Sequence, residues 1–167
     1  MGEIKNLSES DAIEKVKELA EEIDICMLCT YENGRMMARP MSTQKVDDEG
    51  NVWFLSDKSS DSNRQIENNN EVDLLYSKDY YKYLALHGSA EILFDKDKIK
   101  ELWKKHAEIW FTEGVDDPRI SVIKFNFDDG HYWDNKNGRI VQLTKMAASL
   151  LTGKTMDDGI EGDLENL

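Results

Sequence analysis

The sequence has no apolar run that approaches the length of a membrane-spanning helix. Residues 1–9 are polar and lack the apolar core of a secretory signal peptide. We therefore expect a cytoplasmic location and no membrane partner. Basic residues are also scarce, with 21 Lys and Arg against 34 Asp and Glu and a formal charge of -13. This balance argues against a broad contact with nucleic acid, although a local cluster of donors could still hold one phosphate.

Cysteine is almost absent, and the two that occur form a C-x-x-C motif, Cys26 and Cys29. Apolar and polar residues alternate around them, and Asn33-Gly34 follows, which predicts a strand that runs into a turn. Residues three apart on a strand point to opposite faces. We therefore expect two buried structural thiols that neither join nor share a metal. No second cysteine pair is present to complete a zinc site.

The remaining composition is that of one folded domain. The chain has 167 residues, of which 40% are hydrophobic, and no linker divides it. We assign residues 1–154 to a single domain. Residues 155–167 hold five acids and no base, and we expect a loose acidic tail there.

Hydrophobic periodicity predicts an α+β fold. Short turns between the strands favour one antiparallel sheet closed into a barrel with peripheral helices. Helices are expected after residues 8–11, near 64–68, at 95–109 and at 144–151. Strands are expected at 23–30, 35–46, 52–56, 72–77, 81–94, 120–127, 130–134 and 138–143.

Two aromatic segments stand beside glycine, acids and proline. The first is 110–119, which begins Trp110-Phe111, and the second is Tyr132-Trp133-Asp134. Large rings in a turn region line a pocket or an interface in many proteins, because they carry much apolar area. The alternative interpretation is that they cap the open end of a sheet.

A strand, a polar turn and a helix start meet in the segment 54–64. Hydroxyls and free backbone N–H groups gather there, and Lys58 and Arg64 add positive charge. Such a helix N-terminus can hold a phosphate. The alternative is a plain helix cap with Ser60 or Asp61 at the N-cap position.

The segment 39–42, Arg39-Pro40-Met41-Ser42, is a second candidate. Proline removes one donor from the strand ladder and leaves neighbouring backbone groups free to face a ligand. The alternative is a surface arginine on an edge strand.

Ordinary catalytic motifs are missing. His87, His106 and His131 have no metal-ligand spacing, and we expect solvent-facing or hydrogen-bonded histidines. The sequence contains no nucleophile elbow, phosphate-binding Walker loop or dinucleotide fingerprint. No general acid–base pair stands out, so the catalytic residues are unknown. A cofactor could supply the chemistry instead.

Taken together, these motifs resemble the general stress protein branch of the pyridoxamine 5'-phosphate oxidase-like superfamily. The likeness extends over about residues 8–150. It is carried by Trp110-Phe111-x-x-Gly114-x-x-Asp117-Pro118, Tyr132-Trp133-Asp134, Trp53-Phe54-Leu55-Ser56, the turn 60–64 and Arg39-Pro40-Met41.

The resemblance implies an FMN-binding split barrel that forms a homodimer with the flavin at the subunit interface, FAD being a less favoured cofactor. The implied activity is that of a flavin-dependent oxidoreductase linked to the stress response. The alternatives are a non-catalytic flavin- or ligand-binding stress sensor and a structural dimer whose pocket has decayed. The cofactor-binding candidates are Arg39, Pro40, Met41, Ser42, Phe54, Ser56, Lys58, Ser60, Ser62, Arg64, Trp110 and Trp133.

One departure from the family pattern concerns the phosphate. Relatives carry a lysine two residues after the turn serine, where this chain has Ser62. Loss of that cation weakens the hold on a phosphate dianion, because charge-assisted hydrogen bonds are the stronger kind. Lys58 or Arg64 could take its place.

Overall fold

A computed structural model describes residues 3–79, 81–134 and 159–166. Its helical elements are α1 (Glu9–Ile23), α2 (Asp61–Asn68), α3 (Lys96–Leu102) and the 3-10 turns η1 (Lys105–Ile109) and η2 (Gly114–Asp116). Its strands are β1 (Glu3–Ile4), β2 (Leu7–Ser8), β3 (Ile25–Glu32), β4 (Arg35–Ser42), β5 (Lys45–Val46), β6 (Val52–Asp57), β7 (Glu71–Lys78), β8 (Lys82–Leu93), β9 (Ile120–Asp134) and β10 (Ile160–Glu165). No helix in the described ranges is long and apolar enough to cross a membrane.

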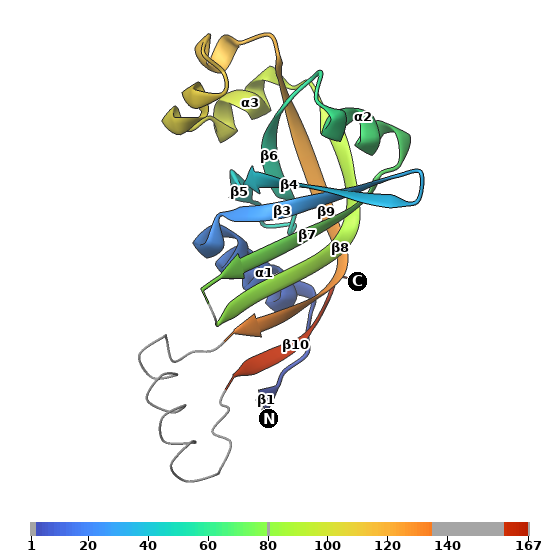
Figure 1. The fold of residues 1–167 in the computed structure, drawn as a ribbon. Coiled ribbons are helices and arrows are strands. Elements are labelled where there is room, and N and C mark those ends of the chain that lie inside the picture. Colours follow the sequence, from blue (N-terminus) through green and yellow to red (C-terminus); the bar gives the residue numbers. More distant parts are fainter. Residues whose placement is uncertain (1–2, 80, 135–158, 167) are drawn as a thin grey trace.

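The fold is α+β, a split barrel whose sheet does not close. The main path of the sheet runs β1-β10-β9-β8-β7-β3-β4, while β6 joins it through β9 (Figure 1). Among the described strands, β4 pairs only with β3, and β6 only with β5 and β9. No ladder therefore joins β4 to β6. The closed barrel expected from the turns is wrong at this seam, whereas the split barrel implied by the resemblance is confirmed. The expected strand at 35–46 is divided between β4 and β5.

Strand β9 is continuous where two strands were predicted. Asp128-Asp129-Gly130 has the composition of a turn, yet the chain stays paired with β8 on both sides of it. The register shifts between His87 and Gly88, which pair with Asp129 and Phe127. Asp128 is thus the extra residue of a β-bulge, and a bulge bends a strand without ending it. The strand predicted at 138–143 and the helix at 144–151 lie outside the described residues, as does the boundary at 154.

The C-terminal segment is a strand and not the expected loose tail. Residues 160–165 pair antiparallel with β9 and parallel with β1 and β2. Buried and exposed residues alternate along this acidic segment: Gly162 and Leu164 are buried, and Asp163 and Glu165 are exposed. That alternation is the pattern of a half-buried strand.

Helix α1 covers one face of the sheet, behind β7 and β8 in Figure 1. We call this the inner face. Val16 and Leu19 of the helix are fully buried there against Leu28 and Leu74 of the strands. The helical spacing of Ile13, Val16, Leu19, Ala20 and Ile23 predicts this inward face, and the structure confirms it, because residues three and four apart share one face of a helix.

The two cysteines are free and buried, as the strand pattern predicts. They lie on opposite faces of β3, since only Cys26 belongs to the core beneath α1. Burial raises the pKa of the Cys26 thiol to about 12.

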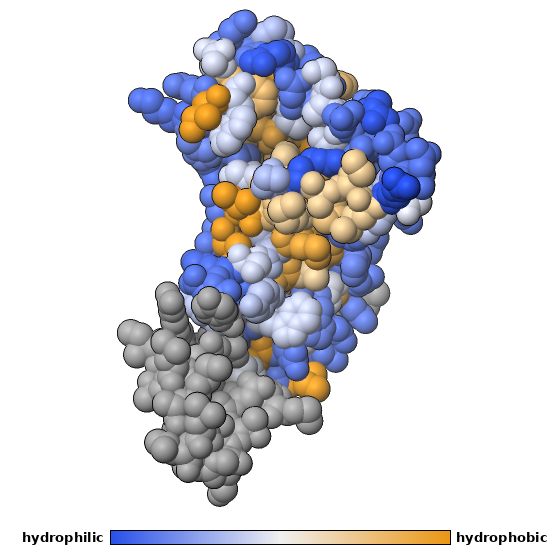
Figure 2. Space-filling model, viewed as in Figure 1, coloured by the Kyte–Doolittle hydropathy of each residue, from blue (hydrophilic) through white to orange (hydrophobic). Residues whose placement is uncertain are grey.

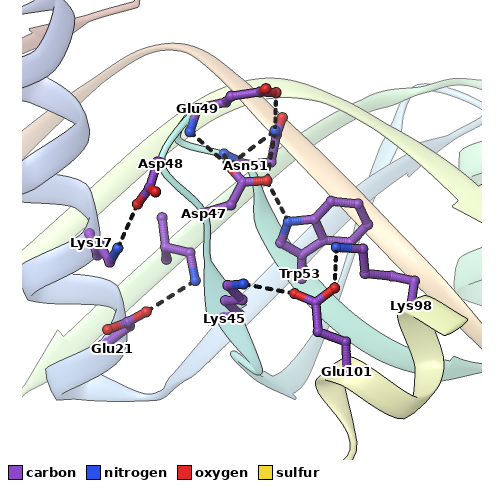
Figure 3. Close-up of polar contacts among 11 residues, drawn as sticks. Lys17, Glu21, Lys45, Asp47, Asp48, Glu49, Asn51, Trp53, Lys98 and Glu101 are labelled. Carbon is purple, nitrogen blue, oxygen red and sulfur yellow. Dashed lines mark hydrogen bonds and ion pairs between the residues drawn. The ribbon is translucent and has the colours of Figure 1, made fainter.

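The helix predicted at 95–109 breaks in two. Helix α3 ends at Leu102, and Trp103 and Lys104 adopt extended backbone angles before η1 begins. The break lets Ala107 and Phe111 join Ile99 in a second core cluster. Polar contacts then tie α3 to the sheet: Lys45 bonds Glu101, and the Lys98 ammonium lies 4.4 Å from the centre of the Trp53 ring (Figure 3).

A tight turn, 47–51, positions strand β6. The Asp47 carboxylate accepts hydrogen bonds from the backbone N–H groups of Glu49 and Asn51 and from the indole N–H of Trp53 (Figure 3). Burial alone would raise the pKa of Asp47, but these donors outweigh it and lower the pKa below its usual range. The anchored turn sets the start of β6, whose far end borders the open seam.

Candidate functional site

A groove of about 570 Å³ lies at the seam where β4 and β6 do not pair. Strand β4 and the segment after it supply one wall, and β6 supplies the other. The start of α2 and the η1 region close its ends. The lining residues are Ile25, Pro40, Met41, Ser42, Gln44, Leu55, Ser56, Asp57, Ser60, Ser62, His106, Ala107, Trp110 and Phe111.

The groove gathers more than half of the candidates predicted from the sequence. These are Pro40, Met41, Ser42, Ser56, Ser60, Ser62 and Trp110. They come from three motifs that are distant along the chain: the arginine-proline strand, the segment 54–64 and the first aromatic segment. The open seam brings these motifs together, because Met41 and Ser56 lie on the two strands that flank it.

Hydroxyl groups form the polar end of the groove, at the start of α2. Ser60 is the N-cap, and its Oγ accepts a hydrogen bond from the Asn63 N–H. Its Oγ also lies 2.9 Å from the Ser62 Oγ. The cap interpretation is therefore correct, and it coexists with a helix N-terminus that opens into a cavity. Such a terminus presents N–H donors and partial positive charge to an anion.

A deeper chain of polar contacts fixes this end. The Ser56 Oγ lies 2.8 Å from the Ser121 Oγ, which accepts a hydrogen bond from the Asn63 side chain at 2.7 Å. All three residues are at least nine-tenths buried. Strands β6 and β9 and helix α2 are thereby held in fixed relation, so the hydroxyls of the groove have fixed positions.

Gln44 is a groove residue that the sequence did not indicate. Its Nε2 donates to the Ser42 carbonyl, but its buried Oε1 has no hydrogen-bond partner among the residues that the structure describes. An unpaired buried acceptor is unfavourable by about 1–3 kcal/mol. A ligand N–H or O–H placed in the groove would satisfy it.

Arg39 stands next to the groove but does not line it. Its guanidinium donates to Thr30 Oγ1 at 2.9 Å and to Gln65 Oε1 at 2.7 Å. Both acceptors are neutral, and burial lowers the pKa of Arg39. Within the described part of the chain no carboxylate pairs with Arg39, so neutral polar groups hold its charge beside α2.

The other two candidate cations are directed elsewhere. Arg64 forms ion pairs with Glu32 and with Asp61, which hold its pKa above the usual value. Lys58 lies 5.3 Å from the centre of the Phe94 ring and lines a different cavity. Neither residue lines the groove in place of the cation missing at Ser62. Phe54 is fully buried in the core and also lies outside the groove.

Trp133 and Trp110 do not meet within one chain. Trp110 lines the groove, whereas Trp133 packs edge-on against Tyr83, with ring centres 6.5 Å apart. Trp133 lies on the face of the sheet opposite α1, which we call the outer face.

The outer face is apolar and exposed. Met27, Leu75, Tyr83 and Trp133 lie on it, and each is between 36% and 41% exposed. Figure 2 shows apolar side chains gathered over β3, β4 and β7 on this side of the molecule. Ile25 and Pro40 have the register of this face and also line the groove, so the two surfaces are continuous.

Two of the three histidines have the expected hydrogen-bonded setting, and His106 is exposed at the groove. His87 pairs with Asp73 and His131 with Asp163. No group of His, Cys, Asp and Glu in the described ranges could hold a metal ion.

Comparison with known proteins identifies the family. Residues 11–157 match the family model for pyridoxamine 5'-phosphate oxidase-like proteins. The chain therefore belongs to this family, and structural neighbours place it in the general stress protein branch.

Two of these neighbours are bacterial crystal structures. One, assigned to general stress protein 26 of Jannaschia sp. CCS1, is 26% identical with a TM-score of 0.76 over 93% of this chain and 98% of that one. A protein from Clostridium acetobutylicum, related to general stress protein 26, is 28% identical with a TM-score of 0.64 over 74% of this chain and 89% of that one.

Two further relatives are more distant. A general stress FMN/FAD-binding protein from Xanthomonas citri shares the fold, at 22% identity with a TM-score of 0.64 over 77% of this chain and 91% of that one. Protein bli-3 of Neurospora crassa is 20% identical over 131 residues, which are 72% of this chain and 63% of that protein. The chain thus spans less than two thirds of the curated relative.

Proposed function

We propose that the protein is a cytoplasmic, homodimeric flavin-binding protein of the stress response, with FMN as its cofactor. The groove at the open seam carries this proposal. Its walls are apolar, its size suits a ring system with a polar chain, and its polar end lies at a helix start. The family membership and the FMN/FAD-binding relative from Xanthomonas citri support the same ligand class.

The residues present fit a flavin phosphate held largely by neutral donors. Ser60, Ser62 and the first N–H groups of α2 would bind the phosphate. Arg39 would supply positive charge from the neighbouring strand, because Lys58 and Arg64 are directed elsewhere. The Gln44 Oε1 would accept a hydrogen bond from the ring system. A bound flavin supplies the electron-transfer chemistry that the chain's own side chains lack.

An absorbance scan with mass identification of the bound molecule tests the cofactor. The purified protein should be yellow, with a flavin band near ~450 nm. Ser60→Ala and Gln44→Leu should weaken FMN binding, whereas Ser10→Ala, which removes an exposed hydroxyl on α1 outside the groove lining, should not. A colourless protein that also fails to bind added FMN would overturn the proposal.

We further propose that a second copy of the chain covers the outer face. Exposed apolar side chains that lie together on one face mark interaction surfaces, and this face continues into the groove through Ile25 and Pro40. A second copy would therefore wall the groove on its open side. It would also allow Trp133 of one chain to approach the groove of the other, the only way in which Trp110 and Trp133 could share a pocket.

Light scattering tests this pairing. The chain should have the mass of a dimer, and the double variant Met27→Asp/Leu75→Asp should be a monomer with weakened FMN binding. Glu71→Gln is the control, because Glu71 is an exposed residue at the start of β7, the strand that carries Leu75. A monomeric parent chain, or a double variant that stays dimeric, would contradict the pairing.

A second candidate function is flavin or ligand binding without catalysis. Among the described residues, Asp57 and His106 are the only titratable side chains that line the groove. The Asp57 carboxylate is engaged by the Ser59 hydroxyl and backbone N–H, which lower its pKa. NAD(P)H should bleach the bound flavin faster than free flavin if the protein is an oxidoreductase. An equal rate would favour the binding function.

A further inference from the structure

A second, smaller cavity borders the same β6–α2 turn that borders the groove. It has a volume of about 250 Å³, and we call it the lysine crevice. It lies between α3, the 114–118 segment and the start of β9. Its lining residues are Lys58, Phe94, Lys96, Ile99, Lys100, Val115, Asp116, Asp117, Pro118 and Ile120.

Three lysines at this crevice have no carboxylate partner among the described residues. Seven of the thirteen lysines in the described ranges form ion pairs: Lys15 with Glu18 and Asp134, Lys17 with Asp48, Lys45 and Lys98 with Glu101, Lys78 and Lys82 with Glu22, and Lys124 with Glu91. Lys58, Lys96 and Lys100 form no such ion pair. They leave a local surplus of positive charge in a chain whose formal charge is -13.

The two acids at the crevice do not cancel this surplus. The Asp117 carboxylate is fully buried and already paired with Arg119 at 2.7 Å, and its pKa is lowered by that bond. Among the acids that line the crevice, Asp116 alone remains to oppose three lysines. An anion would therefore find net attraction here although the chain as a whole repels it.

The rest of the crevice is apolar. Ile99 and Ile120 are buried, and Val115 and Pro118 complete the lining. Phe94 is 59% exposed, with the Lys58 ammonium 5.3 Å from its ring centre. An exposed ring beside a cation offers a stacking surface next to a charge.

We propose that the lysine crevice binds a small anion carried on a single ring, an aromatic carboxylate or an aryl phosphate. The lysines would hold the anionic group, and the ring would lie against Phe94 and the apolar lining. Pockets that hold drug-sized ligands have volumes of about 300–1,000 Å³. A cavity of about 250 Å³ is therefore suited to one ring with its charged substituent.

The crevice and the groove are separate sites. Arg119 stands between them: its guanidinium contacts Asp117 of the crevice on one side and the Trp110 carbonyl and Asp57 of the groove on the other. The proposal therefore does not depend on what the groove binds.

Titration calorimetry of the full chain at low ionic strength tests the crevice. Benzoate and phenyl phosphate should each bind once per chain. Inorganic phosphate, which lacks the ring, and benzyl alcohol, which lacks the charge, should each bind at least about tenfold more weakly. The tighter of the two anions identifies the carboxylate or the phosphate as the natural group. No binding of either anion, or equal binding of benzyl alcohol, would overturn the proposal.

Matched variants locate the binding. Each of Lys58→Gln, Lys96→Gln and Lys100→Gln should weaken it about twofold to fivefold, and the triple variant at least about tenfold. Lys5→Gln/Lys104→Gln/Lys105→Gln removes the same charge elsewhere and should leave the affinity within about twofold. An equal loss of affinity in this control variant would overturn the proposal, because it would indicate nonspecific attraction of the anion to positive charge. Displacement of either anion by FMN would overturn it in favour of the groove.

Discussion

The two faces of the sheet use the same kinds of residue, but among the described elements a helix covers only the inner face. Leu74 points to the inner face and is fully buried beneath α1, whereas its neighbour Leu75 points to the outer face and is 41% exposed. Met27 and Leu28 show the same contrast on β3. An apolar residue on a strand therefore indicates that its face is meant to be buried, but not what buries it.

The comparison of Leu74 with Leu75 should give the largest effect. Leu74→Ala removes a side chain from the closed core and should lower the free energy of unfolding by about 2–5 kcal/mol. Leu75→Ala should lower that of the dilute, dissociated chain by less than about 1 kcal/mol, because its side chain remains half in water.

Urea unfolding at several protein concentrations measures both variants. The loss caused by Leu75→Ala should grow with concentration, since it acts on the pairing of two chains. Equal, concentration-independent losses in the two variants would show that the outer face is buried by the chain itself.

The C-terminal strand extends the comparison to a smaller effect. A Cβ added to Gly162 on the inner side would lie 1.9 Å from the Lys5 carbonyl oxygen. Gly162→Ala should therefore push β10 away from the β1–β2 connection and lower the free energy of unfolding by about 1–3 kcal/mol. Asp163→Ala, the next residue on the outer side, should change it by less than about 0.5 kcal/mol. Thermal unfolding of the two variants tests this difference. Equal stability of the two variants would indicate that residues 160–165 are a loose tail.

The smallest expected effect is a pH dependence on the outer face. The Tyr31 hydroxyl donates to the Asp73 carboxylate, and this bond, together with burial, raises the pKa of Tyr31 to about 12. The folded pKa exceeds the unfolded value of about 10, so the protonated form favours folding. Its contribution is complete below about pH 10 and is lost as the pH rises through about 12.

Melting temperatures measured from pH 8 to pH 12 test this assignment. Tyr31→Phe should flatten the alkaline part of the curve, and Tyr83→Phe, which removes a hydroxyl from the same face but leaves the Asp73 bond, should not. An alkaline slope that is unchanged in Tyr31→Phe would refute the role of this hydrogen bond.

Much of the fold and of the candidate site could be predicted, because the signals are local. The stripe of α1, the Asn33-Gly34 hairpin and the opposed cysteines each depend on residues close in sequence. The hydroxyl-rich turn was likewise recognised as a helix start, and Ser60 caps it. A resemblance to known proteins was needed to connect that turn with the segment 39–42.

The errors occur where distant segments override a local pattern. Asp128-Asp129-Gly130 would form a turn alone, but pairing with β8 on both sides absorbs it as a bulge. An isolated segment 160–165 would be solvated. In the fold it pairs with β9 on one side and with β1 on the other. Trp103 and Lys104 continue the helical spacing of apolar and polar residues, yet their backbone is extended. The residues that follow, such as Ala107, pack into the second core cluster.

By itself, the sequence determined which residues are apolar, where the chain turns and which side chains share a face, because these properties depend on spacing and local backbone preference. The tertiary structure alone decided that β4 and β6 stay unpaired and that a groove opens between them. It also decided the place of each cation: Arg64 is drawn to Glu32, Lys58 to Phe94, and Arg39 remains beside the helix start. Charges interact with whatever the fold brings within a few ångströms, and that neighbourhood comes from long-range contacts that spacing does not encode.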